Sequence, residues 1–211
     1  MNREDALQQL STLVGKDLRP FADNYKITVW LDDHKNKGWA GHTIERFLGL
    51  PLNSAQSPDF GSWELKVVPL VATKTGSLRV KETMAITMID PYEVAEKPFE
   101  QSHLLNKLQK IVVVARIFES QRDERSLVHS VAPFDLDDEV IYQQVKADYE
   151  LVRLAIRTEG FHSLTGKMGI RVQPRTKGAG HGSSSRAFYA RTSFVAHLLG
   201  KGYSIPLPVQ P

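Results

Sequence analysis

Two carboxylates and a lysine stand close together in the segment PDFGSWELK and could support metal-assisted hydrolysis. Side chains alternate along a strand, so Glu64 and Lys66 share one face of the strand expected near residues 62–70. A carboxylate pair binds Mg²⁺ through oxygen, and the metal can activate a water for attack on a phosphodiester. Lys66 can orient or deprotonate that water, and Asp59, just upstream, can complete the site.

The Glu-x-Lys triplet alone is weak evidence, because chance produces about one such triplet in a chain of this size. A solvated strand face is the plainer interpretation of the triplet by itself. An apolar run from Val67 to Leu70 follows at once, which is typical of a strand that enters a core. The charged pair therefore stands where burial begins, and this position favours a site.

A helix is expected over residues 37–48, opened by Gly38 and ended by Gly49. Its core-facing stripe consists of Ile44, Phe47 and Leu48. Glu45 falls beside that stripe and could point toward Asp59. Spacing alone fits an ordinary surface glutamate as well.

Composition narrows the class of protein. The chain has 211 residues, of which 41% are hydrophobic, and we expect one globular domain over residues 1–211. The absence of cysteine excludes disulfides, thiolate zinc sites and cysteine nucleophiles. No apolar run approaches the ~20 residues of a membrane span, and the N-terminus lacks a signal-peptide pattern. We therefore expect a soluble, cytoplasmic protein with no membrane partner.

Charge is distributed unevenly along the chain, although the net charge is only +3. Residues 160–211 contain no acid but seven bases, with Phe161, Phe188 and Tyr189 among them, whereas residues 119–150 contain nine acids and three bases. A solvated surface is the plainer interpretation of a charge run. The length of the acid-free stretch favours a basic face for nucleic acid and an acidic face turned to solvent.

A coarse pattern of elements follows from periodicity and caps. We expect helices near residues 3–14 and 37–48, and a long helix near 137–158 that the acids of 135–139 open. Strands are expected near 62–70, 78–89, 110–118 and 126–132. The fold class is thus α/β, a mixed sheet flanked by helices, with a catalytic lobe over about 1–159 and a basic DNA-recognition lobe over about 160–205.

Four motifs occur in the order and approximate spacing of a known family. They are GWAGHTIERFLG, PDFGSWELKVVPL, EQSHLLNKL and SRAFYARTSF. As a set they resemble the MutH-like endonucleases, which comprise the MutH mismatch-repair enzymes and related GATC-cutting type II restriction enzymes. The resemblance covers roughly residues 5–200, and the motifs are far more specific together than singly.

The resemblance implies a restriction-endonuclease-like PD-(D/E)xK fold and assigns roles to residues. Asp59, Glu64 and Lys66 match the catalytic core, in which Asp59 and Glu64 hold the metal, Mg²⁺. Glu45 matches an additional active-site acid, and Lys107 a further active-site lysine. Without the family, the leucines around Lys107 would favour a surface lysine that snorkels to solvent.

The basic C-terminal stretch holds the expected DNA-reading elements. Residues 170–175 look like a strand that leads to a loop made rigid by Pro174. Arginine can pair bidentately with guanine and glutamine with adenine. In the family the corresponding loop reads bases, and the tyrosine that matches Tyr189 takes part in recognition and in sensing adenine methylation. Gln173 and Arg175 flank Pro174 where the mismatch-repair enzyme has arginine and lysine, so GATC specificity does not follow. The candidate DNA-binding residues are Gln173, Arg175, Lys177, Arg186, Tyr189 and Arg191.

These observations predict a Mg²⁺-dependent, sequence-specific DNA endonuclease with a single catalytic centre. Our main interpretation is a type II restriction enzyme that cuts double-stranded DNA, as a dimer on DNA or by sequential nicks. The close alternative is a mismatch-repair nicking enzyme that is sensitive to adenine methylation and activated by a partner protein. A catalytically inactive DNA-binding module is an alternative of another class. The presence of Asp59, Glu64, Lys66 and Lys107 argues against it.

Overall fold

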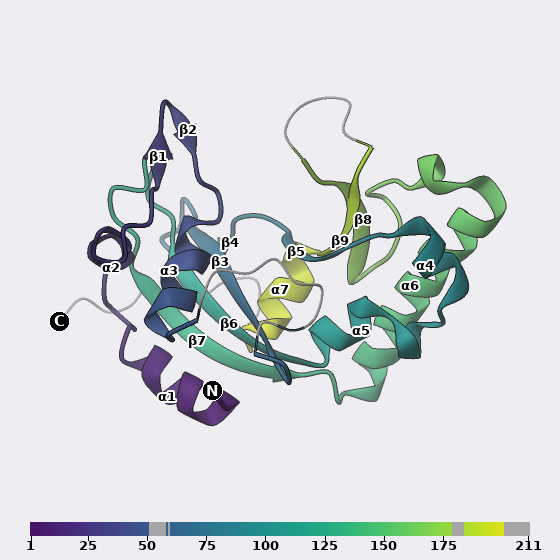
Figure 1. Cartoon of the computed structure of the whole chain (residues 1–211), viewed down its shortest axis with the longest axis horizontal. Coiled ribbons are helices and arrows are strands. Elements are labelled where there is room, and N and C mark those ends of the chain that lie inside the picture. The colour runs from purple at the N-terminus through teal and green to yellow at the C-terminus, as the bar shows by residue number, and fades with distance from the viewer. Residues whose placement is uncertain (51–57, 59, 179–183, 201–211) are drawn as a thin grey trace.

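A mixed four-stranded sheet forms the centre of the protein (Figure 1). The structure is a computed structural model, and it describes residues 1–50, 58, 60–178 and 184–200. The strands lie in the order β4-β3-β6-β7, where β3 and β6 are parallel and the outer pairs are antiparallel. Their bounds are Glu64–Ala72 for β3, Leu78–Val80 for β4, Lys110–Ile117 for β6 and Val128–Asp135 for β7.

Helices cover both faces of this sheet. The first face packs against α1 (Arg3–Ser11), α2 (Leu18–Asn24) and α3 (Trp39–Phe47). The second face belongs to a larger core, to which α4 (Pro91–Glu96), α5 (His103–Leu108), α6 (Glu139–Glu159) and α7 (Thr192–Leu198) contribute. Alternate residues of β6 enter the two cores, Val112 the first and Val113 the second. A strand buried on both faces must be apolar throughout, which explains the run IVVVA in β6.

A second, three-stranded antiparallel sheet has the order β5-β9-β8. It consists of β5 (Met84–Met88), β9 (Arg186–Ala190) and β8 (Val172–Thr176), and a small separate hairpin consists of β1 (Trp30–Leu31) and β2 (His34–Lys35). In Figure 1 the β1–β2 and β8–β9 hairpins project on the same side of the molecule.

The single strand expected over residues 78–89 is wrong. The chain leaves the central sheet after β4, passes through residues 81–83, and enters the second sheet as β5. Both halves bury alternate side chains, among them Leu78 and Val80 in β4 and Met84 and Ile86 in β5. Alternation therefore continues across the break, and it carries no information about which sheet a strand joins.

The boundary expected near residue 160, between the two predicted lobes, does not separate the two sheets. Strand β5 precedes residue 160 and pairs with β9, which follows it. The two sheets also share one core, in which Val68 of β3 and Phe188 of β9 both lie. Asp148 on α6 anchors the start of β8, since its carboxylate accepts hydrogen bonds from the backbone nitrogens of residues 170–172 at 2.6–2.8 Å.

Most of the other expected elements are confirmed. The helix predicted over 37–48 is α3, with Gly38 as N-cap and Gly49 at φ 78° beyond its end. The helix predicted over 137–158 is α6, whose N-cap Asp138 accepts a hydrogen bond from the Ile141 nitrogen. The first helix ends at Ser11, earlier than expected, and α2 was not predicted. In the described part of the chain, no helix has the length and apolarity that crossing a membrane requires.

Candidate active site

The Glu64 carboxylate lies fully buried at the start of β3, with two lysine amines around it. The Lys66 Nζ lies 2.5 Å from Glu64 Oε1. The Lys107 Nζ lies 3.0 Å from Oε1 and 3.2 Å from Oε2 of the same carboxylate. The structure therefore brings together three of the five residues to which the sequence assigned catalysis.

Sheet topology explains how Lys107 reaches Glu64. Strands β3 and β6 are parallel, and Glu64 is paired in register with Ile111 near the start of β6. Helix α5 ends at Leu108, just before β6, so its last turn lies beside the first residue of β3. Lys107 is only 7% exposed, and the interpretation as a snorkelling surface lysine is wrong.

The two amines also make the burial of Glu64 tolerable. A buried carboxylate is costly unless opposite charges and hydrogen bonds compensate it. Lys66 comes from the same face of β3, as alternation predicts, while Leu65 points into the core on the other face. The side chain of Lys66 keeps 18% of its surface exposed. It therefore reaches both the buried carboxylate and the solvent.

Glu45 approaches the same place from α3. The helix buries Trp39 and Ile44 in the first core, and Glu45, half-buried, lines a cleft of about 420 Å³ together with Lys66. Asp59 lies outside the described residues, so the expected contact between Glu45 and Asp59 remains a prediction.

Oxygen donors of the kind that Mg²⁺ prefers are present at this site. Glu64 supplies a buried carboxylate, and Glu45 lies on the wall of the adjoining cleft. Within residues 1–50, 58, 60–178 and 184–200, no group of three acidic, histidine or cysteine side chains forms a ready metal cage. Mg²⁺ commonly binds through one or two carboxylates and keeps several waters, and the donors present fit that habit.

An open groove leads from this site to the β8–β9 hairpin. The cleft beside Glu45 adjoins a second hollow of about 600 Å³, and the two share the lining residues Lys37, Lys66, Val67, Pro69 and Glu82. The second hollow continues along β5 to residues of β8 and β9. Basic side chains and the candidate site therefore face one continuous surface.

Arg175 and Tyr189, two of the residues that the sequence predicts to read DNA, lie on the wall of this groove. The Arg175 guanidinium donates a hydrogen bond to Thr83 Oγ1 at 2.9 Å and lies 5.8 Å from the centre of the Tyr189 ring. Burial raises the pKa of Tyr189.

Three other candidates for DNA binding have different surroundings. Gln173 is 5% exposed inside the fold. Arg191 donates hydrogen bonds to the carbonyl oxygens of residues 166–169, at 3.0–3.3 Å, and so holds the loop before β8. Arg186 donates to the carbonyl oxygens of Ser184 and Ser185 and lies 5.9 Å from the Phe161 ring. These contacts are structural, and none of the three residues is on the groove wall.

The sequence did not single out Lys37, Glu82 and Thr83, which also line the groove. Lys37 stands just before α3, and its place beside a helix N-terminus was the available signal. Glu82 and Thr83 lie in the turn between β4 and β5, which the sequence assigned to the interior of one strand. Recognising that turn requires knowing that the chain changes sheets.

A buried network connects α3 to β6. Asp123 is 0% exposed and lies 2.6 Å from the Lys35 Nζ, and its carboxylate accepts hydrogen bonds from Arg116 and from the Trp39 indole at 3.0–3.2 Å. Burial acts to raise the pKa of Asp123, but the hydrogen bonds from Arg116 and Lys35 outweigh it and hold that pKa below its usual value. Asp123 and Asp148 are both buried, so the expected solvent-facing role of the acidic stretch is wrong for these two residues.

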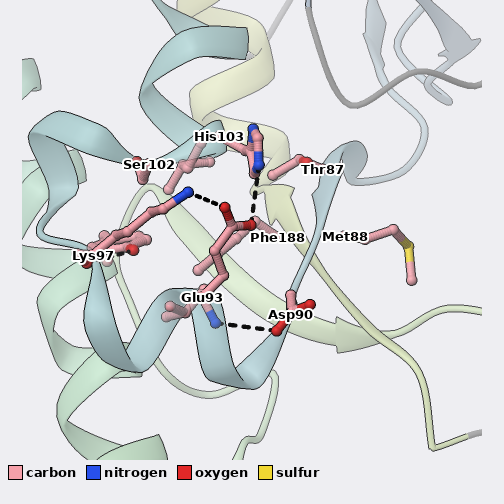
Figure 2. Close-up of a pocket in the computed structure, with 11 residues that line it drawn as sticks. Thr87, Met88, Asp90, Glu93, Lys97, Ser102, His103 and Phe188 are labelled. Carbon is pink, nitrogen blue, oxygen red and sulfur yellow. Dashed lines mark hydrogen bonds and ion pairs between the residues drawn. The ribbon is translucent and has the colours of Figure 1, made fainter.

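A second polar cluster holds α5, which carries Lys107 (Figure 2). The Glu93 carboxylate on α4 pairs with Lys97 and lies 3.0 Å from the His103 Nε2 at the start of α5. The void that these side chains surround measures about 10 Å³, which is room for a single water. This cluster is therefore a strut between two helices, and a substrate does not fit in it.

Comparison with known proteins finds similarity to mismatch-repair proteins, both in a family model and in relatives that align over nearly the whole chain. The family model described as DNA mismatch repair enzyme MutH matches residues 48–139, which include Glu64, Lys66 and Lys107. A DNA mismatch repair protein MutH of Vibrio cholerae serotype O1 is 28% identical, over 96% of this chain and 97% of its own length. The protein of the same name from Shewanella sp. (strain MR-4) is also 28% identical, over 95% of each chain.

These relatives carry mismatch-repair names, so they favour the alternative interpretation over a type II restriction enzyme. Among solved structures, a complex of restriction endonuclease MvaI with its cognate DNA aligns over 97% of each chain, with 13% identity and a TM-score of 0.38. The family match includes the three clustered residues of the candidate site, and the sequence similarity extends over nearly the whole chain. Both comparisons support a MutH-like endonuclease family for this chain.

Proposed function

We propose that this protein is a divalent-metal-dependent DNA endonuclease of the mismatch-repair type, which nicks one strand of a duplex. The observation that carries the proposal is the buried Glu64 carboxylate beneath Lys66 and Lys107, at one end of a groove that basic side chains line. The names of the relatives favour a repair role, and the single catalytic centre favours a nick.

Glu64 and Glu45, with Asp59 as the predicted third ligand, would hold the metal ion. A bound Mg²⁺ would lower the pKa of a coordinated water and stabilise negative charge on the phosphate. The site offers carboxylate oxygens, which suit Mg²⁺ better than a soft metal. Metal dependence is therefore part of the proposal.

The protein's own residues have separate tasks. Lys66 faces both the carboxylate and the solvent, so its amine can donate a hydrogen bond that orients the attacking water. Lys107 is more deeply buried and fixes the position of Glu64 through two hydrogen bonds. Lys37 and Arg175 on the groove walls would bind phosphates or base edges of double-stranded DNA.

The form of the product tests the proposed function. Supercoiled plasmid with Mg²⁺ should give nicked circles, and full methylation of the cognate adenines should suppress them. Addition of a mismatch-repair activator protein should accelerate nicking. Rapid conversion of unmethylated plasmid to linear DNA by the protein alone would instead support the restriction-enzyme interpretation, and failure to cut with any divalent metal would refute both.

A further inference from the structure

The β8–β9 hairpin continues to the active-site cleft. Strand β8 ends at Thr176, and the Lys177 nitrogen donates a hydrogen bond to the Ser185 carbonyl oxygen at 3.0 Å. This bond extends the ladder of the hairpin by one more pair. The backbone of Lys177 is therefore fixed by the hairpin itself.

Alternate residues of β8 and the residue that follows it lie along a path from the fold interior to the cleft at the candidate site. Gln173, Arg175 and Lys177 occupy alternate positions, so they share a face, with roughly 6.6 Å between successive members. Gln173 is buried, and Arg175 lies on the groove wall beside Tyr189. Lys177 lines the cleft that also contains Glu45 and Lys66.

The charges around Lys177 indicate what it can bind. Although Lys177 keeps an exposed surface, burial lowers the pKa of its amine, and the positive charges of Lys66 and Lys107 lower it further. Lys66 of β3 and Lys177, just after β8, therefore line one cleft, and Lys107 of α5 holds the Glu64 carboxylate beside Lys66. Such a concentration of positive charge is suited to a phosphate, whose charge increases as hydrolysis proceeds.

We propose that Lys177 binds the scissile phosphate, so that the β8–β9 hairpin supplies part of the catalytic centre. The inference rests on the proposed endonuclease function and deepens it. Arg175 lies on β8, and Lys177 directly follows that strand, so a hairpin that is not bound to its DNA sequence keeps the Lys177 amine away from the phosphate. Sequence reading and strand cutting are coupled through Arg175 and Lys177, because a small displacement of a positioning group is costly to catalysis.

A thermodynamic cycle between protein and DNA tests this contact. The protein carries Glu64→Gln to prevent cutting, and the duplex carries a neutral methylphosphonate at the scissile position or at the next phosphate. With Lys177 present, the scissile methylphosphonate should weaken binding about tenfold, as expected for a hydrogen bond between charged groups. With Lys177→Met, the same change should alter binding less than about twofold, whereas the matched control Lys167→Met, an exposed lysine away from the groove, should keep the tenfold effect.

Cutting rates provide the second readout. In the protein with Glu64 intact, Lys177→Met should lower the single-turnover rate about 100-fold, as loss of one transition-state donor does, and Lys177→Arg should restore part of it. Equal methylphosphonate effects with and without Lys177, or coupling to the neighbouring phosphate, would overturn the inference while leaving the proposed function intact. A parent protein that neither binds nor cuts the duplex would overturn the proposed function itself. Unfolding midpoints of all variants separate these results from loss of the fold.

Discussion

The environment of Glu64 is built from both local and distant residues. Its contact with Lys66 was predictable, because it needs only the alternation of a strand. Its contact with Lys107 was not predictable from spacing, because it depends on the parallel register of β3 and β6. The family resemblance named Lys107, and the topology gives the physical reason.

Replacement of Lys107 tests whether its contact with Glu64 is needed for cutting. Lys107→Met should lower the single-turnover cutting rate about 100-fold, because Glu64 then loses the partner that fixes it. Lys110→Met is the matched control, since Lys110 is exposed at the start of β6. The control should cut like the parent protein, and a Lys107→Met rate within threefold of the parent would contradict the assignment.

Among the helices and strands, those with long apolar runs or clear caps were predictable from the sequence. The segments against which they pack or pair were not. Helices α3 and α6 and strands β3 and β6 follow from caps and apolar runs. The assignment of residues 78–89 to two sheets, and the burial of Asp123 within an acidic stretch, depend on contacts between segments far apart in the sequence. Short-range patterns do not contain that information.

The Asp123 network, which ties α3 to β6, should make stability depend on pH. Asp123→Asn leaves Arg116 and Lys35 without their counter-charge, and should lower the free energy of unfolding by about 3 kcal/mol at pH 7. The folded pKa of Asp123 lies below 3.8, so its stabilisation is present above that pH and is lost as the pH falls through the folded pKa. Urea unfolding of both proteins across this range should show the difference shrinking in acid. A difference that is independent of pH would contradict the assignment.

Tyr149 joins α6 to the end of α4, because its hydroxyl donates a hydrogen bond to the Lys97 carbonyl oxygen at 3.0 Å. Burial raises the pKa of Tyr149 to about 12 from 10.0, so the stabilisation that its proton provides is complete below pH 10 and is lost toward pH 12. Tyr149→Phe should cost about 1 kcal/mol at pH 7. In an ultraviolet titration of the parent protein, one tyrosine should ionise near pH 12, and Tyr149→Phe should remove that step. A parent protein in which every tyrosine ionises near pH 10 would contradict the burial of the Tyr149 hydroxyl.

At the scale of the whole molecule, the groove joins elements from both sheets into one surface. Lys37 and Lys66 come from one side, and Arg175 and Tyr189 from the other. The uneven charge of the sequence predicted a basic face. It did not predict that Arg191 holds a loop, or that the lysine before α3 faces the same groove.

Salt dependence of DNA binding tests the groove. The logarithm of the binding constant should fall linearly with the logarithm of salt concentration, by about 0.9 for each phosphate neutralised. If Arg175 contacts a phosphate, Arg175→Gln should reduce this slope by about 0.9. If it reads a base, the slope should persist while discrimination at one base pair is lost at a cost of roughly 1–3 kcal/mol. An unchanged slope with unchanged discrimination would remove Arg175 from the interface, and Lys167→Gln serves as the exposed control.

In the proposed function, the Glu64 centre cuts DNA that is bound in this groove. The most direct test compares single-turnover nicking of a duplex in Mg²⁺ by the parent protein and by Glu64→Gln, alongside their affinities for the same duplex. Because the substitution removes a carboxylate from the buried centre and leaves the basic groove unaltered, nicking should fall at least about 100-fold while affinity stays within about threefold. Nicking by Glu64→Gln at the parent rate would show that Glu64 is not part of the catalytic centre.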